Sequence, residues 1–400
     1  MEAIEQEFVQ QLTSESIDHE FLLVYSDWLQ ERGDPRGEII ALEYALELDN
    51  KTNRDRLDLQ KRLDYLMQAQ ESALQLSTEN LNDITLTWTA GAVTKIDVNR
   101  DCLEALGCSI AETVQFKFLT TINLSGHELD EVPVWLGQLT QLTALYLYDN
   151  NISELPEWLG QLTQLTRLHL YLNDISELPE WLGQFTQLTQ LYLSDNNISE
   201  LPESLTQLTQ LTELGLGSNN VSELPKSLGQ LTQLTELYLY DNNISELPES
   251  LGQLTQLTEL YLYGNDISEL PESLGQLTQL TDLDLSNNNI SELPESLGQL
   301  TQLTGLNLYD NNINELPDWL GQLTQLTGLY LRDNNISELP ESLGQFTQLT
   351  QLSLGKNNIS ELPESFGQLT QLTWLDLREN NIGKLSDTLK KRFEEEDWLY

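Results

Sequence analysis

Cysteine and histidine, the side chains best suited to nucleophilic, acid–base or metal chemistry, are scarce in this 400-residue chain. Cys102 and Cys108 could form a redox pair, supply a nucleophile or fill a core, and we favour the last because no second pair completes a zinc site. His19, His127 and His169 lie far apart in the sequence, which does not indicate a joint site. A Gly-x-x-x-x-Gly-Lys-Ser/Thr phosphate loop is absent as well. We therefore expect that the chain is not an enzyme and holds neither a metal nor a cofactor.

Carboxylates, by contrast, are abundant: 64 acidic residues against 19 basic ones give a net charge of −45. Acidic residues recur every 23 positions in two columns, 154–361 and 157–364, the second interrupted only by Lys226. We interpret the columns as a solvated rim, with a rail for a basic partner or for divalent cations as the alternative. The charge repels phosphate, so we expect no nucleic acid and no membrane as partners, whereas a basic protein or peptide is suitable.

The acidic columns belong to a repeat of 23 residues. Each copy holds the segment Leu-x-x-Leu-x-Leu-x-x-Asn-x-Ile, as at 142–152, followed by Leu-Pro-x-x-Leu-Gly-x-Leu. About twelve copies fill residues 118–385, and in the divergent first copy His127 stands at the asparagine position. Leu-x-Leu alternation is typical of a strand, and copies 23 residues apart can pair only as parallel neighbours. One copy is too small to be stable alone, so we expect a stacked column with capped ends.

This motif resembles the leucine-rich repeat family, and its Leu-Pro continuation is similar to the intracellular type of that family. The resemblance implies an α/β fold, a leucine-rich-repeat solenoid shaped as a horseshoe with a parallel sheet on its concave face. Extracellular members commonly carry flanking cysteine clusters, which this chain lacks. The first residues contain no apolar run of signal-peptide length, and no stretch approaches the ~18 apolar residues of a membrane span. We therefore expect a cytoplasmic protein.

Asparagine recurs where each strand ends and the chain turns. Its side-chain amide can satisfy backbone groups of the inner turn that water does not reach, which predicts a ladder of stacked asparagines. We expect His127 to be a structural substitute at the first position of this ladder. The ladder comprises Asn150, Asn173, Asn196, Asn219, Asn242, Asn265, Asn288, Asn311, Asn334, Asn357 and Asn380.

The segments on either side of the repeats have their own patterns. Residues 1–82 are expected to form a small all-α domain, in which Gly33 ends one helix and Asp34 caps the next. Residues 83–117 alternate around Gly91 as a hairpin does, and we predict that this connector caps the array. Residues 386–400 break the repeat and predict a C-terminal helical cap.

The stretch "LLVYSDWLQERGDPRGEIIALE" resembles a short bacterial domain of unassigned function that precedes repeat arrays. The resemblance covers 40 to 50 residues, implies a bacterial source and implies no chemistry. The residues that carry it are Tyr25, Asp27, Trp28, Leu29, Glu31, Arg32, Gly33, Asp34, Pro35, Arg36, Gly37 and Glu38.

Differences between the copies concentrate at four positions per repeat, in and just after the strand. When the leucines point inward, the residues between them point outward together and cover one sheet face. Ten of the fourteen tyrosines lie there, and tyrosine gives large contact area at low entropic cost. The alternative is cross-strand packing that only stabilises the sheet. The predicted partner-binding residues of this concave face are Tyr146, Tyr148, Arg167, His169, Tyr171, Tyr192, Tyr238, Tyr240, Tyr261, Tyr263, Tyr309, Tyr330, Arg332, Trp374 and Arg378.

Together these features predict a non-enzymatic protein–protein interaction module that binds a protein or peptide on a tyrosine-rich acidic face. The alternative is a structural or assembly protein in which the array is a spacer or an oligomerisation surface. The sequence leaves the oligomeric state open, with a slight preference for a monomer.

Overall fold

The computed structural model describes residues 3–12, 18–48, 53–73, 84–89, 92–98, 116, 118–383 and 389. The chain forms two compact units, Met1–His169 and Leu170–Tyr400, which are called unit 1 and unit 2 below. Cys102 and Cys108 lie outside the described residues, and so does the expected C-terminal cap apart from Leu389.

Four helices open the described part of unit 1, which confirms the all-helical N-terminal region. The turn between the second and the third has the expected residues in the expected roles. Gly33 has a φ of 70°, and Asp34 accepts a hydrogen bond from the backbone N–H of Arg36 at 3.0 Å, capping the helix that follows. A Cβ at Gly37 would lie 2.5 Å from the carbonyl oxygen of Ser26, so only glycine allows these two helices to approach so closely. The helices are α1 (Ala3–Leu12), α2 (His19–Glu31), α3 (Pro35–Glu47) and α4 (Asn53–Ala73).

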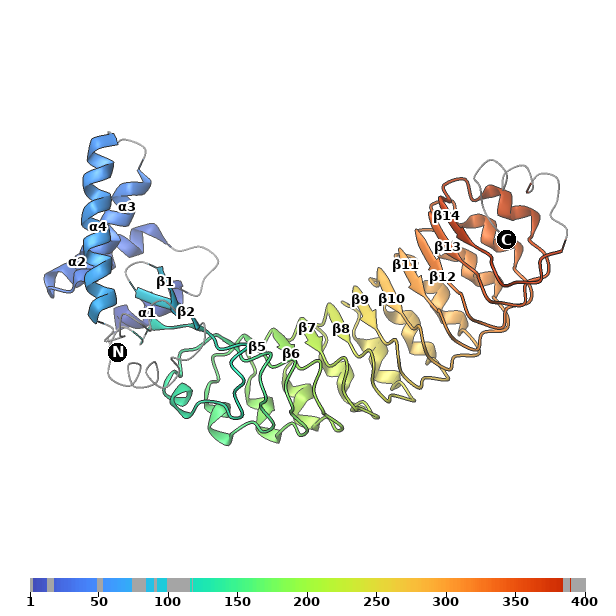
Figure 1. Ribbon diagram of the computed structural model, residues 1–400, viewed down its shortest axis with the longest axis horizontal. Helices are drawn as coiled ribbons and strands as arrows, with labels where there is room; N and C mark the ends of the chain where they lie inside the picture. Colours follow the sequence, from blue (N-terminus) through green and yellow to red (C-terminus); the bar gives the residue numbers. More distant parts are fainter. Residues whose placement is uncertain are drawn as a thin grey trace. The chain divides into compact units, whose positions relative to one another are not determined.

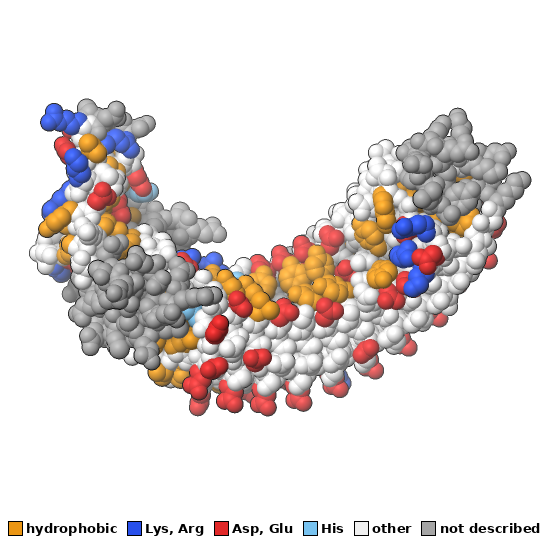
Figure 2. Space-filling model, viewed as in Figure 1, with side chains coloured by type: hydrophobic (Ala, Val, Ile, Leu, Met, Phe, Trp, Pro, Cys, Tyr) orange, Lys and Arg blue, Asp and Glu red, His pale blue; other side chains and the backbone are white. Residues whose placement is uncertain are grey.

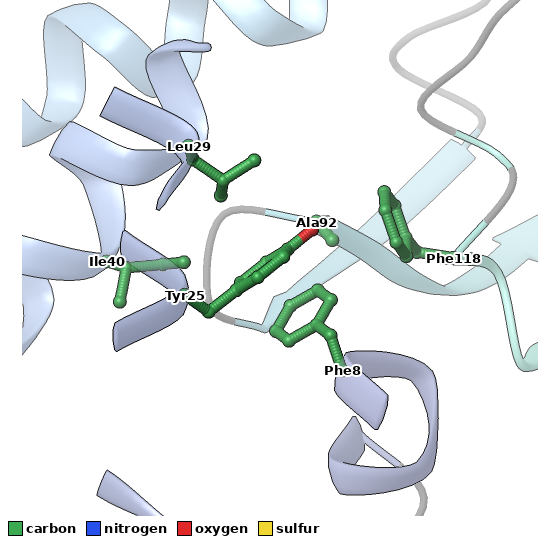
Figure 3. Close-up of a cluster of buried hydrophobic side chains, with 6 residues drawn as sticks. All are labelled: Phe8, Tyr25, Leu29, Ile40, Ala92 and Phe118. Carbon is green, nitrogen blue, oxygen red and sulfur yellow. The ribbon is translucent and has the colours of Figure 1, made fainter. Parts of the chain in front are cut away.

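An aromatic core connects these helices to a hairpin. Strand β1 (Ile84–Thr89) pairs antiparallel with β2 (Ala92–Val98), and β2 pairs in parallel with the first repeat strand, β3 (Thr121–Asn123). In Figure 3 the ring of Tyr25 lies beside that of Phe8, with centroids 4.1 Å apart, and Phe118 stands edge-on to Phe8 at 5.4 Å. The guanidinium of Arg36 covers Phe118 at 4.6 Å. The hairpin therefore continues the repeat sheet through β2, and Ala92 at the start of β2 belongs to the core that the helices form.

Each repeat contributes one short strand and a 3-10 helix on the return path. Neighbouring strands pair in parallel with an offset of 23 residues, for example Leu237 with Leu260. Within unit 2 the strands line the inner side of a curve (Figure 1), as expected for a leucine-rich-repeat solenoid. Unit 1 holds β3, β4 (Ala144–Tyr146) and β5 (Arg167–His169), and unit 2 holds β6 (Gln190–Tyr192), β7 (Glu213–Gly215), β8 (Glu236–Tyr238), β9 (Glu259–Tyr261), β10 (Asp282–Asp284), β11 (Gly305–Asn307), β12 (Gly328–Tyr330), β13 (Gln351–Ser353) and β14 (Trp374–Asp376).

The repeated leucines are buried within each repeat. In the repeat around β8, Leu237, Leu239 and Ile244 have no exposed surface, and Leu237 lies in register between Leu214 and Leu260 of the neighbouring strands. Pro248 is extended, with φ −70° and ψ 143°, and leads into the 3-10 helix Glu249–Gln253. The return path is therefore helical, since proline cannot donate to a strand ladder.

Buried asparagines connect successive turns. Asn242 is 7% exposed, and its Nδ2 donates to the carbonyl oxygens of Leu216 at 2.9 Å and Leu239 at 3.2 Å. Its Oδ1 accepts from the backbone N–H of Val221, in the preceding repeat, at 2.9 Å. At the first turn, Nδ1 of His127 lies 2.8 Å from the carbonyl oxygen of Ser125. The side chain of Asn242 thus satisfies buried backbone groups of two repeats at once.

The residue before each of these asparagines adopts a left-handed backbone. Its φ lies between 48° and 60° at ten repeats and is 66° at Gly264. Aspartate, asparagine and glycine tolerate this conformation best, which explains why they dominate the position. The fourth variable position therefore follows from turn geometry, and we exclude it from the surface that could bind a partner. The ten residues are Asp149, Leu172, Asp195, Ser218, Asp241, Asn287, Asp310, Asp333, Lys356 and Glu379.

We expect Asn242→Leu to lower the free energy of unfolding by about 1–3 kcal/mol, because it leaves the buried N–H of Val221 without a partner. It also removes one of the two asparagine donors to each of the carbonyl oxygens of Leu216 and Leu239. Urea unfolding followed by circular dichroism measures the change. Asn243→Leu, at the exposed neighbouring position, is the matched control and should shift the midpoint much less. Equal midpoints for the two variants would contradict the role of the ladder.

Candidate protein-binding surface

The outward side of the repeat strands is the candidate site. We call it the strand-face strip and define it as the first and last residue of each strand together with the residue two positions further on. In unit 2, Figure 2 shows hydrophobic side chains, a class that there includes tyrosine, gathered on this side and bordered by acidic side chains, with basic side chains nearer the C-terminus. Of the fifteen residues predicted from the sequence, Tyr146, Tyr148, Arg167 and His169 belong to unit 1 and the other eleven to unit 2.

Tyrosine rings in the middle of unit 2 pack on one another. The rings of Tyr240 and Tyr263 are parallel within 7° and have centroids 4.8 Å apart. Those of Tyr238 and Tyr261, one row away, lie 5.2 Å apart with an interplanar angle of 44°. All four side chains are half-buried, so the cross-strand packing is real and each ring still presents surface to a partner.

Two glycines determine how two of the strip tyrosines lie. A Cβ at Gly217 would lie 2.3 Å from the ring of Tyr240, and a Cβ at Gly215 would lie 2.7 Å from the ring of Tyr192. Each ring therefore lies close over a glycine of a neighbouring repeat, in space that a Cβ would fill. The sequence signal was present, because glycine occupies positions where adjacent repeats have tyrosine, but its meaning needs the ring positions.

A row of carboxylates runs beside the tyrosines. Glu213, Glu236, Glu259 and Asp282 begin four consecutive strands and are direct neighbours in register. The hydroxyl of Tyr238 donates to Glu236 at 2.6 Å and to Glu259 at 3.1 Å. A tyrosine hydroxyl also donates to Glu213, from Tyr192. The sequence search for site residues omitted this row because it concentrated on aromatic and basic side chains.

The carboxylate row changes the ionisation of its neighbours. Burial raises the pKa of Tyr261 to about 12, and the adjacent Glu259 and Asp282 add to the shift. The pKa values of Tyr192 and Tyr238 rise in the same direction, first through burial and then through hydrogen bonds to carboxylates. Burial, followed by Glu259 and Asp284, also raises the pKa of Asp282. This part of the strip is therefore strongly negative and short of counter-charge.

Two of the three arginines predicted in the strip, Arg332 and Arg378, form ion pairs with their own chain. Arg332 contacts Asp376 at 2.9 Å and Glu379 at 2.8 Å, while Arg378 contacts Asp376 at 2.8 Å. Hydrogen bonds from Arg378 are the main cause of the lowered pKa of Asp376. Beside this cluster the side chain of Trp374 is 44% exposed. The C-terminal end of the strip is thus close to charge-balanced, unlike the acidic middle.

Unit 1 also holds an aromatic pair. The ring of Tyr146 stands edge-on to that of His169, with centroids 4.8 Å apart. Arg167, which begins the same strand as His169, is exposed. Across the described residues of both units, no group of three histidine, cysteine, aspartate or glutamate side chains could hold a metal ion. No helix in the described ranges is long and apolar enough to cross a membrane.

The parallel strands, the leucine core and the buried asparagines define the class of repeat solenoid to which this chain belongs. Three family models of this repeat match the chain. The model described as "Leucine Rich Repeat" matches residues 141–162, and the one described as "Leucine rich repeat" matches 163–221, 209–267 and 324–382. A third, "Leucine-rich repeat region", matches residues 260–331. Together they extend over more than half of the chain. The chain belongs to the leucine-rich repeat family.

Solved structures give the same fold. A leucine-rich-repeat protein of Leptospira interrogans superposes with a TM-score of 0.68 at 29% identity, over 80% of this chain and 90% of that one. An internalin of Listeria monocytogenes gives a TM-score of 0.64 at 27% identity with the same coverage. The plant peptide hormone receptor RGFR1, in complex with RGF2, gives 0.62 at 32% identity over 68% of this chain and 45% of the receptor chain. No curated protein matches the sequence.

The carboxylate row should be visible in tyrosine titrations. Glu259→Gln removes a negative charge beside two phenols, so we expect lower pKa values for Tyr238 and Tyr261. In the native protein the folded pKa of Tyr261 is about 12 against an ordinary 10.0, so unfolding releases a proton and stability falls as pH rises from 10 to 12. The variant should lose less stability over that range. NMR of ring-labelled tyrosine measures the pKa values, with Glu269→Gln as the control, and unchanged values would contradict the arrangement.

Proposed function

We propose that this chain is a non-enzymatic interaction module whose strand-face strip binds a protein or peptide through lysine or arginine side chains. The observation that carries the proposal is the row of Glu213, Glu236, Glu259 and Asp282 in register beside half-buried tyrosine rings. Carboxylates supply charge for an ammonium or guanidinium group, and tyrosine faces attract the same cations. The like charges of the row repel one another until a cation binds between them.

The tyrosine pairs suit this function because they are already ordered. The stack of Tyr240 and Tyr263 over Gly217 holds the rings in place before a partner arrives. Little side-chain entropy is then lost on binding, so a few rings can contribute most of the affinity. The plant receptor of similar fold was solved with a peptide hormone ligand, which supports a peptide as one kind of partner for such a strip.

Three further expectations belong to the proposal. We propose that the protein is bacterial and cytoplasmic. We also propose that its domains are the helical domain 1–82, the connector 83–117, the repeats 118–385 and the C-terminal cap 386–400. We also propose that the N-terminal helical domain belongs to the short bacterial domain family that precedes repeat arrays, which its sequence resembles. The alternative, an array that serves as a spacer or assembly surface, predicts that substitutions in the acidic part of the strip affect stability alone.

A pair of charge-matched variants tests the function. The strip variant carries Glu213→Gln, Glu236→Gln, Glu259→Gln and Asp282→Asn, and the control carries the four glutamine substitutions at Glu200, Glu223, Glu246 and Glu269 in an exposed column. Both change the net charge by the same amount, so a general attraction of basic peptides to an acidic protein affects them equally.

Random peptides are first selected by display on the native chain, and the affinities of the selected synthetic peptides are then measured by calorimetry. We expect peptides rich in lysine and arginine that bind the strip variant at least about tenfold more weakly and the control within about twofold. Equal loss in both variants would show only non-specific charge attraction and would reject the proposed site. Replacing Tyr238, Tyr240, Tyr261 and Tyr263 by serine should also abolish capture, whereas the spacer alternative predicts that it persists.

A further inference from the structure

Unit 1 contains a pocket of about 450 Å³ that is separate from the strand-face strip. It lies between α2, α3, α4 and β1. Its walls are mostly apolar, formed by leucine and isoleucine side chains from the three helices, with the rings of Tyr44 and Trp88 on two sides. Its polar side chains include His19, Glu43 and Glu47. Neither the family nor the repeat sheet accounts for a pocket at this place.

Glu43 is the unusual member of this lining. Its carboxyl is largely buried, and no hydrogen bond or ion pair to it is found among the described residues. Burial, with a smaller contribution from Glu47, raises its pKa to about 7. Glu47, in contrast, is exposed and lies 3.7 Å from the imidazole of His19. A carboxyl in this position opposes folding when it is charged, because nothing in the described part of the protein compensates for its lost hydration.

The lining discriminates among possible ligands. An anion would meet two carboxylates, and a neutral apolar ligand would bury Glu43 further without giving it a partner. A metal ion lacks the third ligand that it needs among the described side chains. An ammonium group on an aliphatic chain fits the carboxyl and the apolar walls, since the cation pairs with the carboxyl, its stem contacts leucine side chains, and aromatic rings favour its charge.

We propose that this pocket binds an alkylammonium group, with Glu43 as its anionic partner, Leu22 and Leu63 against its stem and Trp88 beside the charge. A lysine side chain of a partner polypeptide and a free primary amine are the two sources of this group. The site is independent of the strand-face strip, because it uses no residue of the repeats.

The test uses the full chain and three probes. Nα-acetyl-lysine N-methylamide carries the ammonium on its natural stem, Nα-acetyl-norleucine N-methylamide has the same stem without the charge, and n-butylammonium has the charge without the peptide groups. Ligand-observed NMR gives the dissociation constants. For a ligand of this size we expect a Kd of about 1 mM for the lysine probe and at least tenfold weaker binding of the norleucine probe.

Three variants assign the binding to the pocket. Glu43→Gln should weaken binding of the lysine probe at least tenfold and leave the norleucine probe unchanged. Glu31→Gln, an exposed carboxylate on α2 outside the pocket, should have no effect. The strip variant described above should bind the lysine probe as the native chain does, which separates this site from the proposed function of the strip. Glu43→Gln should also melt no lower than the native chain at pH 8, because it removes a buried charge, and this serves as the folding control.

Absence of binding by the lysine probe at 10 mM, equal affinity for the norleucine probe, or unchanged affinity in Glu43→Gln would each overturn the proposal. Binding of n-butylammonium at least as tight as that of the lysine probe would identify a free amine as the source. Weaker binding of n-butylammonium would identify a polypeptide lysine, and either result supports the alkylammonium site.

Discussion

Buried backbone groups at the end of every strand need a partner that the same repeat cannot fully provide. The asparagine of the following repeat supplies it, as Asn242 does by accepting from Val221 and donating to Leu216. The leucines share this dependence, because a buried strand leucine such as Leu237 lies in register between its copies in the neighbouring repeats. Stability therefore resides between repeats, and the residues that make these contacts are the ones that barely change along the chain. Positions that take no part in them are available for function.

Not every variable position is free to take up a binding role. The residue before each asparagine needs a left-handed backbone, so its preference for aspartate reflects the turn. The outward strand positions carry no such restriction, and there the chain places tyrosines, carboxylates and glycines side by side. Because Gly217 has no Cβ, the ring of Tyr240 can occupy the space above it, where it stacks on Tyr263. The C-terminal end of the strip is less negative than its acidic middle because Arg332 and Arg378 neutralise neighbouring carboxylates there.

At the first repeat strand, β3, unit 1 has a hairpin and helices in place of a preceding repeat. An aromatic core built on Tyr25 and Phe8 holds the helices on the hairpin that extends the repeat sheet. The same packing of α2, α3 and α4 leaves the pocket around Glu43, whose carboxyl opposes folding when it is charged. A side chain that opposes the stability of the free protein is a reason to consider ligands.

The sequence alone determined the period, the parallel strands, the buried leucines, the helices of residues 1–82 and the turn at Asp34, because local pattern and identical neighbours repeat the same contacts. It also placed the tyrosines on the strand face, since strand side chains alternate. Only the tertiary structure decided which rings stack, which carboxylates face them, that Arg332 is paired with Asp376, and that Glu43 borders a pocket. Those relations join side chains from different repeats or helices, and the direction in which a side chain leans depends on space that neighbours leave, which a periodic pattern does not encode.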